Sequence, residues 1–203
     1  MTTPSFEPLT AERRRQQTRD YLLKAAAQVF AQRGFHAATI DEVAAAAGFT
    51  KGAVYSNFKS KEDLFLALLE SAYAHEMASL RQTYESSEVP PSERLEDFAG
   101  LIRTEVDRMP DNWGALYLEF TLYAMRNPEA RQRLNALEAA DIRAVAELIA
   151  EAGDDLGTDP MHAARIVTAL FRGVSLMREL APETVGPEFM TEALSFVARA
   201  LGA

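Results

Sequence analysis

The 203-residue chain predicts an all-α fold, with an N-terminal three-helix domain that contains a helix-turn-helix and a larger C-terminal helical domain, about nine helices in all. Apolar residues recur at helical spacing along most of the sequence, and no segment alternates as a strand does. Small polar residues or prolines mark one helix start after another. We expect residues 1–60 to form the first domain, with a flexible arm over the first twelve or so residues, and residues 61–203 to form the second.

Helix starts and ends are clearly marked in the first domain. Residues 18–33 carry an apolar stripe, and Gly34 follows where a left-handed residue commonly ends a helix. Thr39 precedes Glu42 by three residues, which is the spacing of a capping box. After the turn AGF, Thr50 can cap a third helix. Two short helices joined by a glycine-containing turn predict a helix-turn-helix.

The second domain carries the same signals. Ser60 begins a long fourth helix, and Pro128, Pro160 and Pro187 each stand just inside a helix start, where the missing proline N–H leaves no hydrogen bond unmade. The expected helices span residues 18–33, 39–47, 50–57, 61–85, 92–109, 112–126, 128–152, 160–180 and 187–201.

Composition excludes several functional classes. The chain has no cysteine, which rules out disulfides, thiolate metal sites and cysteine nucleophiles. Its histidines, His36, His75 and His162, are scattered, and the sequence contains neither a phosphate-binding glycine loop nor a nucleophile elbow. We therefore expect no catalytic residue, no metal and no cofactor. No apolar run reaches the length of a membrane span and no signal peptide is recognisable, so we expect a cytoplasmic protein that does not bind membranes.

Charge is distributed unevenly along the chain. Residues 1–61 hold nine Lys and Arg against five Asp and Glu, whereas the remainder holds twelve against twenty-five. This contrast is typical of a nucleic-acid-binding segment joined to an acidic body, although an acidic surface can also serve solubility alone. The run Arg13, Arg14, Arg15 is open to two interpretations, an arm that enters a minor groove or a charged, frayed helix start.

The third expected helix presents a small, polar and basic outer face. This face lies opposite Val54 and Phe58 when those two residues point inward. Its small side chains allow the helix into a major groove, where Ala53 can touch a thymine methyl and Lys51 can reach guanine or a phosphate. The alternative is that the threonines here only cap helices and the lysines are solvated. The candidate DNA contacts are Thr39, Thr50, Lys51, Gly52, Ala53, Tyr55, Ser56, Asn57 and Lys61.

The stretch TRDYLLKAAAQVFAQRGFHAATIDEVAAAAGFTKGAVYSNFKSKEDLFLAL resembles the N-terminal DNA-binding domain of the tetracycline-repressor (TetR) family. The likeness is carried by AA...F...GF..AT, VA..AGFTKGAVY and NF.SKEDL. It implies that the candidate contacts, apart from Ser56, occupy DNA-binding positions, and that a dimerising second domain fits an effector. The family often has His or Tyr at the position of Asn57, where Asn can still donate to a phosphate.

Aromatic residues of the second domain follow a helical stripe over residues 113–124. Such a stripe forms either core or the lining of an apolar site for a small-molecule effector. Glu119 interrupts it, either to pair with Arg103, Arg126 or Arg172, or to meet a cationic or hydrogen-bonding ligand. The candidate effector-binding residues are Phe98, Met109, Trp113, Tyr117, Glu119, Phe120, Tyr123 and Phe171.

The last two expected helices carry more apolar residues than one packed face can cover. A second subunit that completes a four-helix bundle explains this surplus, and burial of both helices within one subunit is the alternative. The candidate interface residues of the homodimer are Leu170, Val174, Met177, Met190, Leu194, Val197 and Leu201.

These patterns together predict a DNA-binding transcriptional regulator, a repressor that binds a near-palindromic double-stranded operator as a homodimer and is released by a small, mostly apolar effector. The long fourth helix is the expected connection between the effector site and the DNA-binding domain. Two alternatives stay open. One is a regulator of the same fold that is constitutive or controlled by a partner protein, and the other is an all-α enzyme with an incidental helix-turn-helix.

Overall fold

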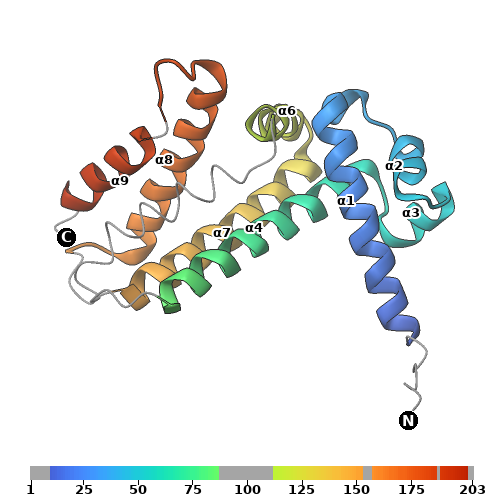
Figure 1. The fold of residues 1–203 in the computed structure, drawn as a ribbon, viewed down its shortest axis with the longest axis horizontal. Helices are drawn as coiled ribbons and strands as arrows, with labels where there is room; N and C mark the ends of the chain where they lie inside the picture. Colours follow the sequence, from blue (N-terminus) through green and yellow to red (C-terminus); the bar gives the residue numbers. More distant parts are fainter. Residues whose placement is uncertain (1–9, 87–111, 153–156, 187, 201–203) are drawn as a thin grey trace, which may run out of the picture. The chain divides into compact units, whose positions relative to one another are not determined.

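The predicted all-α fold is confirmed by the computed structural model, which describes residues 10–86, 112–152, 157–186 and 188–200 (Figure 1). The expected helix over residues 92–109 lies outside these ranges, as do Phe98, Met109 and Leu201. The helices of the described residues are α1 (Ala11–Ala37), α2 (Ile40–Ala47), α3 (Lys51–Asn57), α4 (Lys61–Ser86), α6 (Trp113–Arg126), α7 (Pro128–Ala152), α8 (Pro160–Leu180) and α9 (Phe189–Ala200).

The chain divides into two compact units, Met1–Leu68 and Leu69–Ala203, which we call the N-terminal unit and the C-terminal unit. The division falls inside α4, whereas the sequence placed a domain boundary after residue 60. Helices α1 to α3 lie in the first unit and α6 to α9 in the second, and each unit is described by itself below.

Helix α1 is longer than its apolar stripe. It begins at Ala11 rather than at residue 18, because the Thr10 side chain accepts a hydrogen bond from the Arg13 backbone and so caps a first turn of charged residues. Near its other end, Gly34 takes a positive φ of 74° and kinks the helix. A left-handed conformation of this kind favours glycine. The kink leads the chain to Phe35, which is buried.

The turn between α2 and α3 follows the same local rules. Gly48 ends α2 at a φ of 71°, and the Phe49 N–H returns to the Ala44 carbonyl at 2.9 Å. This left-handed cap satisfies carbonyls that the end of a helix leaves free. The predicted helix-turn-helix is therefore present, with its second helix held by the same tight turn.

The core of the N-terminal unit is aromatic. The ring of Phe65, from the first turns of α4, makes edge contacts with Phe30 and Phe35, each at a centroid distance of 5.3 Å. Val54 of α3 is fully buried and Phe58 nearly so, which fixes how α3 is rotated about its own axis. Aromatic contacts of this kind add to the apolar burial that stabilises a small domain.

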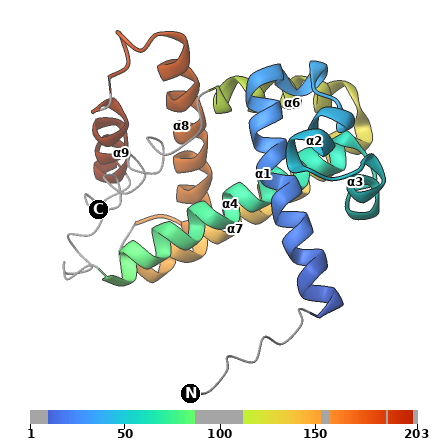
Figure 2. The same ribbon diagram turned by 45° about the vertical axis from the view of Figure 1, so that its right-hand side comes forward.

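In the C-terminal unit, α7 packs against α6 and α8, and α8 packs against α9. One apolar cluster joins α4, α7, α8 and α9 and contains Leu80, Leu148, Val174, Met190 and Leu194. The second half of α4 follows α7 in both views (Figures 1 and 2), and the Tyr84 hydroxyl donates to the Glu151 carbonyl at 3.0 Å. Among the described residues, no helix combines the length and apolarity needed to cross a membrane.

Candidate DNA-binding face and effector domain

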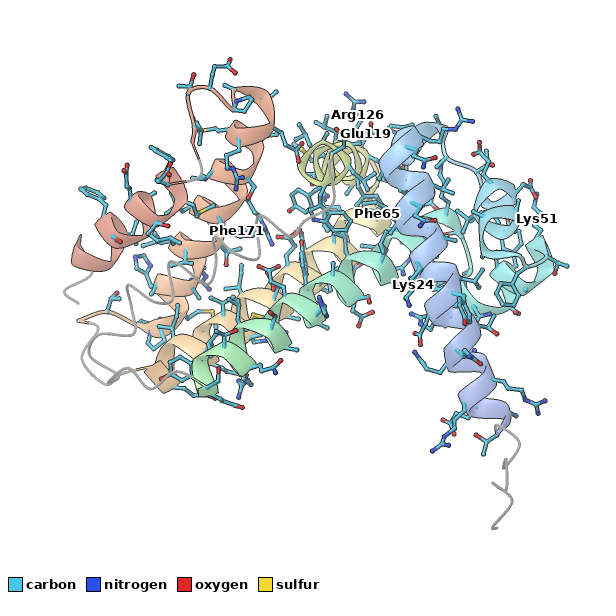
Figure 3. The ribbon with its side chains drawn as sticks, in the orientation of Figure 1. Lys24, Lys51, Phe65, Glu119, Arg126 and Phe171 are labelled. Atoms are coloured by element: carbon cyan, nitrogen blue, oxygen red, sulfur yellow. The ribbon has the colours of Figure 1, made fainter. Side chains whose placement is uncertain are left out.

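Helix α3 displays the residues predicted to contact DNA because its inner face is anchored. Val54 is completely buried, and the Thr50 hydroxyl caps the helix by accepting from the Ala53 N–H at 3.2 Å. Lys51, Gly52 and Tyr55 are exposed as a result, and Figure 3 shows Lys51 at the outer edge of the α2–α3 pair. The predicted contact surface is thus a solvent-facing strip on a well-held helix.

Gly52 leaves room that the protein itself does not fill. A Cβ atom at this position would meet only the Thr50 hydroxyl oxygen, at an ordinary contact distance of 3.7 Å. Packing within the chain therefore does not demand glycine here. The bare backbone suits close approach by a groove of DNA, which is what an outward-facing glycine on such a helix provides.

Ser56 and Asn57 are folded back onto the helix that carries them. The Ser56 hydroxyl and the Asn57 side-chain N–H both donate to the Ala53 carbonyl, at 2.8 and 2.9 Å. Their donors are engaged within α3. Each keeps an oxygen that can accept a hydrogen bond, whereas donation to a phosphate would require a new rotamer.

Lys51 forms an exposed ion pair with Asp41 of α2, at 2.8 Å from its Nζ to the carboxylate Oδ2. This hydrogen bond raises the pKa of Lys51, so the ammonium stays charged. Exposed pairs contribute little stability. The ammonium is therefore held in place by Asp41 yet available to a phosphate or a base.

Lys61 binds the end of α1, a structural role that the sequence did not reveal. Its ammonium donates to the backbone carbonyls of His36 and Ala38, each at 3.0 Å, and lies 4.8 Å from the centre of the Phe35 ring. These carbonyls belong to the end of α1, where a cation is favoured. The phosphate contact of Lys61 stays a prediction, and the side chain is already bound within the unit.

Thr39 caps α2 as expected. Its hydroxyl accepts from the Glu42 N–H at 3.2 Å, and the Glu42 carboxylate accepts from the Thr39 N–H at 2.9 Å. These two contacts complete a capping box. The hydrogen bond from the Thr39 backbone, followed by that from its side chain, lowers the pKa of Glu42.

A partly buried polar cluster lies in the C-terminal unit, and its centre is Glu138 of α7. The carboxylate accepts from the Tyr117 hydroxyl at 2.6 Å and from the Tyr73 hydroxyl at 3.4 Å, and it is bound by the Arg172 guanidinium. Arg172 also lies 3.5 Å from a carboxylate oxygen of Asp141. Four helices, α4, α6, α7 and α8, therefore meet at one group of two acids, one base and two phenols.

Burial shapes the protonation of this cluster. It raises the pKa of Tyr117 to about 12, with the hydrogen bond to Glu138 acting in the same direction. Burial also raises the pKa of Asp141, against the opposing charge of Arg172. Both phenols therefore serve as hydrogen-bond donors at neutral pH, since the pKa of Tyr73 is likewise raised by burial.

Within the described ranges, the other predicted effector residues do not gather at one place. Phe120 is fully buried and its ring lies 5.9 Å from that of Tyr123. Phe171 packs instead on the cluster around Leu148, and Figure 3 shows it on α8, apart from Glu119 on α6. Tyr117 is the predicted effector residue that joins the polar cluster. Glu138 and Asp141 were not among the predicted residues, and the available signal was their spacing of three residues in an alanine-rich helix.

The start of α6 is held by a side chain from α8. Asn112 precedes the helix in a left-handed conformation, with a φ of 66°, and makes no side-chain cap. The Glu179 carboxylate takes that role, since it accepts from the Gly114 N–H at 2.6 Å and from the Ala115 N–H at 2.8 Å. Trp113 is the first residue of α6, directly before these two amides.

The predicted interface residues of α8 and α9 fall into two groups. Val174, Met190 and Leu194 are buried in the apolar core of this chain, so they are not presented to a partner. Met177 is 50% exposed. Sequence reasoning omitted two neighbours that are more exposed still, Leu180 at 75% and Phe196 at 67%.

Among the described residues, no three His, Asp or Glu side chains are grouped as a metal site would need.

Two family descriptions match the chain. Residues 22–68 match bacterial regulatory proteins of the tetR family, and residues 91–202 match the C-terminal domain of BetI-type transcriptional repressors. The HTH-type transcriptional repressor DhaR of Mycobacterium sp. (strain GP1) is 33% identical over 87 residues, which make up 42% of this chain and 44% of DhaR. The activator FasR of Mycolicibacterium smegmatis is 43% identical over 68 residues, 34% of this chain and 31% of FasR. The chain therefore spans less than half the length of these curated relatives.

Solved structures match over far more of the chain. A TetR-family transcriptional regulator from Streptomyces coelicolor is 26% identical, with a TM-score of 0.70 over 93% of this chain and 97% of that one. A putative TetR-family regulator from Rhodococcus sp. shares the fold at 23% identity, with a TM-score of 0.75 over 93% of this chain and all of the other. FadR from Bacillus subtilis, crystallised with stearoyl-CoA, has a TM-score of 0.67 at 16% identity over 90% of this chain and 96% of that one.

Proposed function

Because the chain belongs to the TetR family of bacterial regulatory proteins, we propose that it regulates transcription by binding double-stranded DNA through α3. The observation that carries this proposal is the anchored outer strip of α3. Val54 fixes the rotation of the helix, Gly52 keeps the backbone bare, and Lys51 and Tyr55 extend into solvent. Such a strip can enter a major groove, read base edges and bind phosphates.

The protein acts as a homodimeric repressor in this proposal, in the cytoplasm, on a near-palindromic operator. Exposed apolar residues at the ends of α8 and α9 supply the dimer face, and two copies of α3 then meet two half-sites. DhaR is named a repressor and FasR an activator, so the proposed repression is checked by a reporter gene behind the selected operator, whose expression the protein should lower.

The C-terminal unit takes a small, mostly apolar effector in this proposal. Support comes from the FadR structure with stearoyl-CoA, a fold relative with a bound ligand. The polar cluster around Glu138 would supply the few polar groups that an otherwise apolar ligand site usually contains. An effector releases DNA only if it binds the DNA-incompetent arrangement more tightly, and each tenfold preference supplies about 1.4 kcal/mol.

The test of DNA binding begins with selection of operators from a random duplex pool by the wild-type protein. Lys51→Ala should then lose about 1–3 kcal/mol of discrimination at one base position, whereas Tyr55→Ala should weaken all sequences alike. Arg131→Ala, an exposed arginine on α7, is the control and should leave the affinity unchanged. Failure of the wild-type protein to enrich any sequence, or unchanged affinity in both α3 variants, would contradict the proposal.

The effector is tested with Tyr117→Phe, which removes one hydroxyl and keeps the ring. A compound that releases wild-type protein from the selected operator should lose potency in this variant if it binds near Glu138. Phe120→Ala is a poorer probe, because truncation of a fully buried ring costs about 3–5 kcal/mol of stability. Full potency in Tyr117→Phe would place the effector elsewhere, and the absence of any releasing compound would favour the regulator without a ligand.

A further inference from the structure

The first turns of α1 extend beyond the rest of the N-terminal unit. The Arg19 guanidinium lies over the Phe58 ring, 4.6 Å from its centre, and Phe58 is the residue that ends α3. Residues 11–18 therefore continue past the point where α1 meets α3, by about 12 Å of helix. Figures 1 and 2 both show this segment projecting beyond α2 and α3.

This projecting segment is strongly basic. Residues 11–20 contain four arginines against Glu12 and Asp20, and the Asp20 carboxylate already accepts from the Gln16 side chain at 2.9 Å. Side chains of residues 11–17 are all exposed. Among the described residues, no carboxylate pairs with Arg13, Arg14 or Arg15, which leaves three guanidinium groups open to solvent.

This extension gains no stability from apolar packing within the described part of the unit. The apolar stripe of α1 starts at Leu22, so the turns before it bury no apolar side chain. A basic helix with exposed guanidinium groups is suited to a polyanion, and arginine forms strong paired hydrogen bonds to phosphate. Residue spacing places Arg15 one turn before Arg19, on the face that leads to α3. Arg14 and Arg13 lie roughly 140° and 120° around the helix from Arg19, one in each direction, so the three guanidinium groups surround the projecting turns.

We propose that Arg13, Arg14 and Arg15 bind backbone phosphates of duplex DNA beside the half-site that α3 enters. The contacts are ionic and independent of base sequence, so they lengthen the bound segment without adding base preference. This inference rests on the proposed function, since it assumes that α3 occupies the major groove. It assigns to α1 a second DNA surface, separate from the helix-turn-helix.

The test compares wild-type protein with the triple variant Arg13→Gln, Arg14→Gln, Arg15→Gln on the selected operator at several salt concentrations. The logarithm of the association constant, plotted against the logarithm of the salt concentration, should have a slope shallower by about 0.9 for each phosphate that the variant no longer neutralises. The affinity for the operator should fall about tenfold or more at physiological salt. Operators with shortened flanks should weaken the wild-type protein and leave the variant unaffected. Circular dichroism checks that the variant keeps its helix content.

The matched control is Arg131→Gln, Arg143→Gln, Arg165→Gln, which removes the same charge from exposed arginines of α7 and α8. This control should bind as the wild type does. An unchanged salt slope in the first triple variant, with operator binding intact in the wild type, overturns this inference and leaves the proposed function standing. A wild-type protein that binds no duplex overturns both.

Discussion

Glu138 accepts hydrogen bonds from side chains on three other helices, Tyr73, Tyr117 and Arg172. Charges held in a protein interior lose their hydration and depend on their partners for compensation. Removal of the acceptor leaves one partly buried cation and two phenols without this hydrogen-bond acceptor. Loss of this carboxylate should therefore lower the stability of the C-terminal unit more than loss of an exposed one.

The variant Glu138→Ala should lower the free energy of unfolding by about 2–3 kcal/mol, because it deletes one member of a partly buried ion pair. Urea denaturation followed by circular dichroism measures this value. Glu129→Ala, on an exposed position of the same helix, is the control and should change stability by about 0.5 kcal/mol or less. Equal effects in the two variants would show that Glu138 is not a centre of stability.

Asp141 should make the unfolding free energy depend on pH. Its pKa is raised by burial in the folded state, so the folded protein holds this proton more tightly than the unfolded chain. Its stabilising contribution is present below the unfolded pKa of about 4 and is lost as the pH rises through the folded pKa. The stability of the wild type minus that of Asp141→Asn should therefore fall as the pH increases from about 3 to 7, as measured by urea titrations.

A difference that stays flat across this range would contradict the raised pKa. A difference that rises would mean that Arg172 outweighs burial and lowers the pKa of Asp141 instead.

The role of a residue could be predicted from the sequence where its hydrogen-bond partner is only a few positions away in the chain. The caps at Thr39 and Thr50 follow from spacings of three residues, and the structure has both. Lys61 and Glu138 could not be understood in this way, because their partners lie more than twenty residues distant and depend on how helices pack. The contacts of α3 with DNA stay predictions.

Among the helices, the cap that the Glu179 carboxylate provides at the start of α6 depends on Gly114. A Cβ atom at this position would lie 2.8 Å from a Glu179 carboxylate oxygen, closer than real side chains approach. The carboxylate is the flexible end of its side chain, so it would move away rather than strain the backbone. Displacement of the Glu179 carboxylate would leave the N–H groups of Gly114 and Ala115, at the start of α6, without their acceptor.

The variant Gly114→Ala should therefore lower stability by about 1 kcal/mol, the usual loss when a helix cap is removed. The same change made in a Glu179→Ala background should raise stability by about 0.5 kcal/mol, because no carboxylate is displaced and alanine favours helix. A double-mutant cycle in urea measures this reversal of sign. Equal effects in both backgrounds would show that Gly114 and Glu179 do not interact.

Helix ends were largely predictable because local chemistry decides them. Expected ranges of 128–152 and 160–180 are the observed limits of α7 and α8, where a proline opens each helix. The start of α1 was placed too late, because its first turns contain no apolar stripe to detect. The cap that Glu179 provides joins residues more than sixty positions apart, so no pattern in the local sequence predicts it.

At the scale of the whole molecule, the ends of α8 and α9 expose Leu180 and Phe196, at 75% and 67%. Phe189 and Met177 add to the apolar surface of the same two helices. Several large apolar side chains exposed on neighbouring helices commonly mark an interface. We expect a second copy of the chain to cover them.

The double variant Leu180→Glu, Phe196→Glu should be monomeric at micromolar concentration in sedimentation velocity, whereas the wild type should be a dimer. A charge placed in an apolar interface loses its hydration and opposes association. Met125→Glu is the control, an apolar residue of α6 that is 65% exposed, and it should stay dimeric. A dimeric double variant would place the interface elsewhere.

Assembly was only partly predictable from the sequence. The surplus of apolar residues on the last two helices was visible, yet periodicity could not separate those that face the core from those that face solvent. Val174, Met190 and Leu194 belong to the core. The variant Leu194→Arg would therefore destabilise the fold, and loss of the dimer in that variant would not identify an interface residue. Which apolar side chains are exposed depends on how α8 and α9 pack against the rest of the unit. The 3.6-residue periodicity of one helix does not contain that information.

Trp113 is the chain's only tryptophan, and it stands directly before the two amides that Glu179 holds. Its indole is therefore an intrinsic fluorophore on the residue that directly precedes the contact between α6 and α8. A change in the distance or polarity around that contact would shift its emission, with no label attached and no background from a second indole. Titration of any candidate compound into the protein alone could thus be followed optically, before an operator sequence is known.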